Sequence, residues 1–322
     1  MCAVMHNAFC DESDLDRALR NTQLACGDID SELSHLKTMA GINTAVTAVG
    51  TVSGGVALGT GLAKKSVDAK AEQLEKELED EINRLKQLSV TQVKIDIIPD
   101  VAPQDLTVDA KNKTASNQTA SNKISENSTI DAKKAELEKL TQKSKLLGNV
   151  RTGTLAGAAA TNVAGAIIAS TNRVKGDLSS KIKDCINSVD ELQRTFMSAR
   201  LENTVQNTDN ITEILRECGA WKNVNLSKIN NRSTGAAVSS GVGAAMAISG
   251  TVTSAVANTD ATRNDNSESG KKKEKDLNTA SNVLAGGSTL ASGVATVFNA
   301  TQISVIKDVL KVAENCEKAL NK

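Results

Sequence analysis

The stretch "GINTAVTAVGTVSGGVALGTGLA", residues 41–63, carries no charged side chain from end to end. Gly, Thr, Ser and Asn nevertheless make up about half of it. At about 1.5 Å per residue, a helix of this length crosses roughly 30 Å of hydrocarbon. The stretch therefore fits a membrane span, a packing helix of a soluble protein or a linker. Other features of the sequence are needed to distinguish these three possibilities.

Three more uncharged runs follow, at residues 152–172, 233–259 and 277–306. Small residues recur in them at helical spacing, most clearly from Gly153 to Ala169 in steps of four. Such spacing lets two helix backbones approach closely, in lipid or in water. We expect close helix packing at Gly50, Gly54, Gly153, Gly157, Gly165, Gly243 and Gly286.

The overall composition favours long helices and argues against several functions. The chain has no Tyr, three Phe, one Trp and two Pro, so it lacks both large aromatic core residues and the strongest helix breaker. Lys plus Arg and Asp plus Glu number 38 each, which leaves no net field to attract nucleic acid. The composition therefore predicts an elongated all-α protein that does not bind nucleic acid.

Segments with heptad spacing flank the uncharged runs. Apolar and small side chains alternate at intervals of four and three along residues 15–36 and 178–199, and again near the C-terminus. Two charged segments between the first two runs, residues 64–88 and 131–147, predict the arms of an antiparallel coiled coil.

An ordered set of features occurs twice: a cysteine, an uncharged run, a charged loop, a second run and another cysteine. This order indicates a duplication of antiparallel helical hairpins. The first hairpin is expected at residues 11–200 and the second, shorter one at 201–322. The polar stretch 93–130 is predicted to be a flexible tip, because it lacks a sustained apolar period.

The cysteines are expected to form disulfides within each hairpin. Cys26 and Cys185 lie at similar distances from the first two runs, so an antiparallel hairpin brings them level, and Cys218 and Cys316 occupy the matching positions in the second half. Buried free thiols remain the alternative. Zinc is not expected, because no cysteine pair has ligand spacing and only two His occur. The sequence assigns no role to Cys2 and Cys10.

No sequence motif points to catalysis. The chain contains no nucleophile elbow, P-loop or dinucleotide fingerprint, so we expect neither an enzyme nor a cofactor or small-molecule substrate. The first ten residues do not make a complete secretory signal, which leaves a truncated one as an option.

The function expected from these features is non-enzymatic. We expect a helical protein of the cell envelope or an exported protein, membrane-associated, whose hairpins insert in or lie against lipid. Its expected partners are lipid, further copies of itself or another helical protein. Insertion of a single run is energetically marginal, because Gly, Thr, Ser and Asn offset most of the gain from Val, Ile and Leu. A soluble helical scaffold or filament-forming protein is therefore the alternative.

Overall fold

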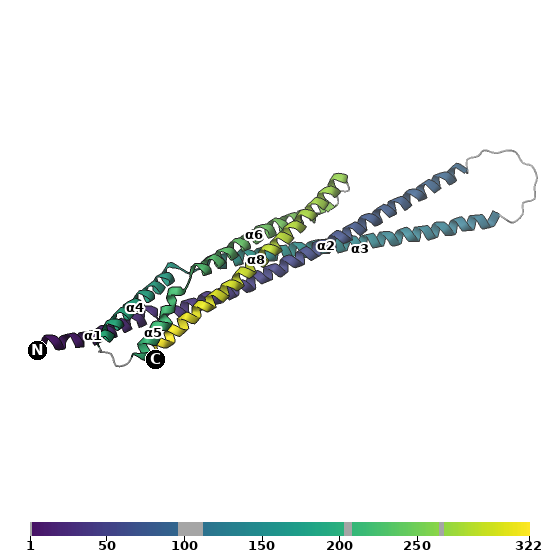
Figure 1. Ribbon diagram of the computed structural model, residues 1–322. Coiled ribbons are helices and arrows are strands. Elements are labelled where there is room, and N and C mark those ends of the chain that lie inside the picture. The colour runs from purple at the N-terminus through teal and green to yellow at the C-terminus, as the bar shows by residue number, and fades with distance from the viewer. Residues whose placement is uncertain (1, 96–111, 203–207, 264–266) are drawn as a thin grey trace, which may run out of the picture. The chain divides into compact units, whose positions relative to one another are not determined.

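The computed structural model describes residues 2–95, 112–202, 208–263 and 267–322, and these residues are almost entirely helical (Figure 1). No strand occurs among them, so the all-α class is confirmed. The elements are α1 (Cys2–Cys26), α2 (Ile29–Ile95), α3 (Asn112–Thr171), α4 (Gly176–Leu201), α5 (Asp209–Gly219), η1 (Ala220–Asn223), α6 (Ser227–Ala257), α7 (Asp260–Arg263) and α8 (Glu268–Leu320).

The helices form two compact units. Unit 1 comprises Met1–Gly55, Leu155–Ser249 and Leu284–Lys322, and unit 2 comprises Val56–Thr154 and Gly250–Val283. Each unit takes segments from both of the hairpins predicted at 11–200 and 201–322, because α2, α3, α6 and α8 each contribute to both units.

The segment predicted as a flexible tip, residues 93–130, is partly helical. Helix α2 extends to Ile95 and α3 begins at Asn112, so helix covers both ends of that segment. Residues 96–111 lie outside the described part of the chain.

Unit 1 contains an apolar core. It is built from α1, α4, α5 and η1, the starts of α2 and α6, and the end of α8, and it includes the fully buried Trp221. The heptad pattern predicted along α4 is confirmed, since all seven of its members are buried: Leu178, Ile182, Cys185, Val189, Leu192, Phe196 and Ala199. This core follows the ordinary rule for a protein in water, with apolar side chains inside.

Helices α1 and α2 are separate because the chain turns at Gly27 and Asp28. The Gly27 amide still donates to the Gln23 carbonyl, but Asp28 has a φ of 60°, which ends the helix. Asp is one of the few residues other than glycine that adopts this left-handed conformation readily. The heptad spacing of residues 15–36 continues across this turn.

Candidate functional site: a polar core inside the uncharged helices

Each of the four long helices has one line of buried positions, spaced alternately by four and three residues. On α2 and α3 the lines are Ile29, Leu33, Leu36, Ala40, Asn43, Thr47, Gly50, Gly54, Ala57, Gly61 and Lys64, and Ser144, Gly148, Arg151, Leu155, Ala158, Asn162, Gly165 and Ala169. On α6 and α8 they are Ile229, Ser233, Ala236, Ser240, Gly243, Ala247, Gly250, Ser254 and Ala257, and Ser281, Ala285, Ser288, Ser292, Ala295, Asn299, Gln302, Ile306, Val309, Ala313, Cys316 and Leu320.

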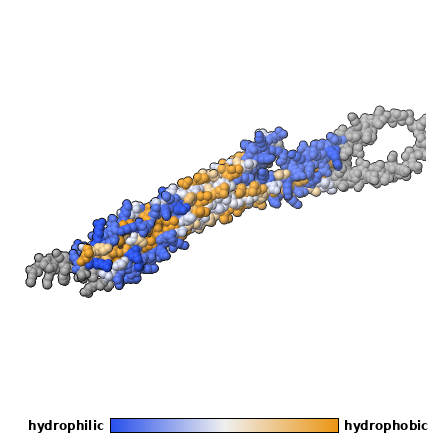
Figure 2. Space-filling view, viewed as in Figure 1, coloured by the Kyte–Doolittle hydropathy of each residue, from blue (hydrophilic) through white to orange (hydrophobic). Residues whose placement is uncertain are grey.

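Within the uncharged runs of unit 1, most of the buried positions are polar or small while the outward face is apolar. The large apolar exceptions are Leu155 on α3 and Ile306 at the end of the last run. Asn43, Ser240 and Ser292 are at most 1% exposed, whereas Val238 is 62% and Leu290 is 73% exposed. Figure 2 shows hydrophobic residues exposed along the helices on the viewed face. This is the reverse of the arrangement in a helix bundle that is surrounded by water. It matches a bundle in hydrocarbon, where small residues and interhelical hydrogen bonds hold the helices together.

Asn162 on α3 is the centre of this polar core, because it reaches the other three helices. Its Oδ1 accepts a hydrogen bond from the Ser292 hydroxyl at 2.8 Å, and its Nδ2 donates to Ser288 Oγ at 3.4 Å, both on α8. A Cβ placed on Gly50 of α2 would lie 3.3 Å from Asn162 Oδ1, and one on Gly243 of α6 would lie 3.1 Å from Nδ2. The two glycines thus leave the space that the Asn162 amide fills.

A second set of hydrogen bonds joins α2 to α8. Asn43 Nδ2 donates to Asn299 Oδ1 at 2.9 Å, and Asn299 Nδ2 donates to Thr47 Oγ1 at 3.4 Å. The Thr296 hydroxyl also donates to Thr47 Oγ1, at 3.1 Å. These contacts pair buried polar groups that would otherwise be costly in an apolar interior.

A third set closes the end of α3. The Ser233 hydroxyl on α6 donates to the carbonyls of Ala169 and Asn172, and Gln302 Nε2 on α8 donates to the same Asn172 carbonyl at 3.1 Å. The last carbonyls of a helix lack partners within the helix. Side chains from two neighbouring helices therefore satisfy them here.

The glycines predicted at helix contacts divide into two groups. A Cβ on Gly54 would lie 2.6 Å from Thr289 Oγ1, and one on Gly165 would lie 2.8 Å from Thr47 Cγ2, so these positions, like Gly50 and Gly243, are in close contact with a neighbouring helix. By contrast, a Cβ on Gly153 or Gly286 would meet nothing within 4 Å, and one on Gly157 would meet only Ser53 Oγ, at 4.0 Å. Close contacts that the sequence did not single out occur at Gly61, Gly148, Gly235 and Gly287.

The structure has two disulfides in the apolar core of unit 1, Cys26–Cys185 between α1 and α4 and Cys218–Cys316 between α5 and α8. The Cα atoms of the two pairs are 4.7 and 4.5 Å apart, within the usual range for a disulfide. All four cysteines are buried. The side chains of Cys2 and Cys10 lie outside the described residues.

The two disulfides are neighbours. The Sγ atoms of Cys26, Cys218 and Cys316 all lie within 4.8 Å of one another. Three sulfurs at such distances could in principle hold a metal ion, but a metal ligand has to be a thiolate, and here each sulfur is bonded to another sulfur. In its disulfide form, the cluster offers no metal site.

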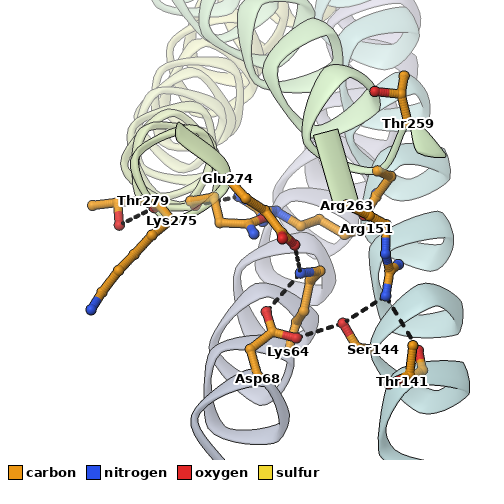
Figure 3. Close-up of polar contacts among 12 residues, drawn as sticks. Lys64, Asp68, Thr141, Ser144, Arg151, Thr259, Arg263, Glu274, Lys275 and Thr279 are labelled. Atoms are coloured by element: carbon orange, nitrogen blue, oxygen red, sulfur yellow. Dashed lines mark hydrogen bonds and ion pairs between the residues drawn. The ribbon is translucent and has the colours of Figure 1, made fainter. Parts of the chain in front are cut away.

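Unit 2 contains a cluster of charged side chains just beyond the ends of the uncharged runs (Figure 3). Lys64 on α2 is 1% exposed and pairs with Asp68 at 2.6 Å and with Glu274 on α8 at 3.2 Å. The Ser144 hydroxyl on α3 donates to the other oxygen of Asp68 at 2.5 Å. Three helices thus meet around one buried ammonium group.

Arg151 lies beside this cluster, one residue before the second uncharged run. It is fully buried, and its Nη2 donates to the Asn278 carbonyl at 2.9 Å while Nη1 donates to Asn278 Oδ1 at 3.3 Å. Burial lowers the pKa of Arg151 to about 10, so the group keeps its charge at neutral pH. A charge at this position marks the end of the apolar part of α3.

Comparison of the chain with protein-family models, with curated proteins and with solved structures finds no match.

Proposed function

We propose that this chain is a non-enzymatic helical protein of the cell envelope, or an exported one, whose four uncharged helices assemble into an oligomeric bundle within a membrane. The observation that supports this most is the inverted burial in unit 1, with Asn, Ser, Thr and Gly inside and Val, Ile and Leu outside. Helices α2, α3, α6 and α8 are long and apolar enough to cross a membrane. Disulfides suggest an exported protein.

The inverted burial bears on how the helices enter the bilayer. A single run gains about 0.3 to 0.6 kcal/mol for each Val, Ile or Leu at the bilayer centre, and its Asn, Ser and Gly oppose much of that gain. Once the bundle has formed, the polar side chains face its interior, where several of them are hydrogen-bonded, for example Asn162 with Ser292, and the apolar faces meet lipid. We therefore propose that the hairpins insert as an assembled bundle.

Four crossings also assign the sides of the membrane. A chain that crosses at residues 41–63 and returns at 152–172, then repeats this at 233–259 and 277–306, has all four bonded cysteines on one side. Disulfides persist in oxidising compartments, so this is the oxidising side. The charged segments around Lys64 and Arg151 then face the opposite side.

Substitution of an outward-facing residue by aspartate tests the proposal. Val238→Asp and Leu290→Asp place a charge on the apolar face, and a charged residue at the centre of a membrane helix costs about 2.5 to 3.5 kcal/mol. We expect both variants to be lost from the membrane pellet after an alkaline carbonate wash, while the wild type is retained. Leu24→Asp is the matched control, since Leu24 is 84% exposed on α1, outside the uncharged runs.

The soluble scaffold predicts a different result. On a surface that faces water, Val238→Asp changes stability by no more than about 0.5 kcal/mol. A wild-type protein that leaves the membrane fraction in the carbonate wash, and that neither binds liposomes nor releases dye from them, would replace the membrane proposal with that scaffold. Sedimentation of the detergent-solubilised wild type tests oligomerisation separately. A protein that is monomeric at all concentrations would contradict the proposed oligomer.

A further inference from the structure

We infer that Cys26, Cys218 and Cys316 form a thiol–disulfide exchange site. When one disulfide is reduced, a freed thiolate attacks the other disulfide and rearranges it. The inference rests on the sulfur positions in the core of unit 1 and does not depend on whether the helices enter a membrane. The three Sγ atoms lie within 4.8 Å of one another, although only Cys218 and Cys316 are bonded to each other. The sulfur of Cys185, bonded to Cys26, falls outside this group.

This asymmetry defines which sulfurs can exchange. A thiolate attacks one sulfur of a disulfide and displaces the other, which leaves as a thiolate. Cys26 is the sulfur of its pair that lies near both Cys218 and Cys316, so it is the one attacked. Cys185 is then the leaving group.

The reaction balances with an external dithiol as the reductant. The dithiol opens the Cys218–Cys316 bond and becomes a cyclic disulfide, leaving two thiols in the protein. The thiolate of Cys218 or Cys316 attacks Cys26 Sγ, a new S–S bond forms, and the Cys26–Cys185 bond breaks. The electron pair of that bond stays on Cys185, which takes up a proton. The product links α1 directly to α5 or α8 and frees α4.

The buried apolar surroundings affect the rate of the exchange. The four cysteines are at most 6% exposed and are packed among aliphatic side chains and Trp221. Apolar surroundings disfavour the charged thiolate that carries out the attack, so they slow the exchange. We expect the exchange to take minutes to hours without a catalyst, as ordinary disulfide rearrangement does.

A pair of matched variants tests the site, both made in the full chain with Cys2→Ser and Cys10→Ser to remove the other thiols. Cys185→Ser leaves Cys26 as a free thiol beside the Cys218–Cys316 bond. We expect new pairs of Cys26 with Cys218 or Cys316 in up to about two thirds of the molecules, the share for three sulfurs that exchange freely. Cys26→Ser leaves Cys185 as the free thiol, and we expect Cys218–Cys316 to stay intact.

The pairs are identified by digestion with pepsin at low pH, where protonated thiols do not exchange, followed by mass spectrometry. A free Cys26 beside an intact Cys218–Cys316 bond in Cys185→Ser would overturn the inference. Equal scrambling in both variants would overturn it too, because exchange would then occur through unfolding rather than through the arrangement of the sulfurs.

A second measurement avoids the cysteine variants within the cluster. The protein with only Cys2 and Cys10 replaced is treated with a limiting amount of dithiothreitol and then quenched with acid. We expect species with one disulfide that joins Cys26 to Cys218 or Cys316, with Cys185 free. If such species contain only the two original pairs, the exchange site does not exist.

Discussion

The Ser292 hydroxyl on α8 donates a 2.8 Å hydrogen bond to Oδ1 of Asn162 on α3, and both residues are fully buried. The outward faces of the same helices carry exposed Val and Leu, so this pair connects two helices at the place where a soluble bundle would have its apolar core. Substitution of Asn162 alone therefore tests whether the bundle is surrounded by lipid or by water.

Replacing Asn162 by Leu should destabilise the bundle by about 1 to 2 kcal/mol, because the hydrogen bonds to α8 are lost and lipid provides no compensating gain for burying an apolar side chain. Reversible unfolding of the detergent-solubilised protein measures this change. Val163→Leu is the control, since Val163 is the next residue on α3 and is 42% exposed. An Asn162→Leu protein that is more stable than the wild type would instead indicate an interior of the ordinary water-soluble kind.

The two glycines at positions 153 and 165 should respond oppositely to alanine. Gly165→Ala places a methyl group 2.8 Å from Thr47 Cγ2, and we expect a loss of about 1 to 3 kcal/mol from overpacking. Gly153→Ala meets nothing within 4 Å and should stabilise the helix by up to about 1 kcal/mol. Thermal unfolding of the two variants under identical conditions checks this, and equal effects would contradict the assignment of the inner and outer faces.

Lys64→Met should weaken unit 2. The substitution leaves Asp68 and Glu274 without the ammonium group that pairs with both of them. Because the two carboxylates are partly exposed, we expect a loss of about 1 to 3 kcal/mol, less than for a fully buried pair. Lys65→Met is the control, because the neighbouring Lys65 is exposed. The rate of limited proteolysis within residues 56–154 reports the effect, and identical rates for the two variants would show that the cluster contributes nothing.

Reduction should lower the melting temperature of unit 1. The two bonds join residues 159 and 98 positions apart, and loss of a native disulfide commonly costs about 2 to 5 kcal/mol. Thermal unfolding with and without a phosphine reductant measures this shift. When both disulfides are formed, the protein with Cys2→Ser and Cys10→Ser should have the same melting temperature as the wild type. If the purified wild type contains six free thiols, the exported location has to be abandoned.

The apolar end of unit 1 could be predicted from the sequence because its inner residues are large and hydrophobic. Leu178, Val189 and Leu192 stand out at heptad spacing among polar neighbours, and Cys185 lies in the same line. The cysteine pairing followed from the equal arm lengths of antiparallel hairpins. The first prediction depended on contrast between inner and outer residues, and the second on the distances of the cysteines from the uncharged runs.

The polar core was missed because that contrast is reversed in the uncharged runs. Ser288, Ser292 and Asn299 occupy the inner line of α8, where a search for apolar periodicity passes over them. The line becomes visible when the spacing from Cys316 is followed backwards in steps of three and four. The spacing of three and four residues before Cys316 was therefore the sequence signal that could have identified the buried polar line of α8.

A Cβ at Gly153 or Gly157 meets no close neighbour for a geometric reason. Steps of four residues advance 400° around a helix, so each step moves the position by about 40°, and a stripe from residue 153 to residue 169 turns through about 160°. Only its later members, Gly165 and Ala169, lie on the inner face. Alternating steps of three and four stay on one face, and the buried residues follow that spacing.

The buried line of α8 changes from polar to apolar between Gln302 and Ile306 while its spacing stays the same. Lys307 and Lys311 are exposed directly after this change. Shifting the helix along the membrane normal by one heptad, about 10.5 Å, would carry both ammonium groups into hydrocarbon. In the proposed membrane bundle, the change from a polar to an apolar interior on α8 therefore sets a single depth at which the helices sit in the bilayer.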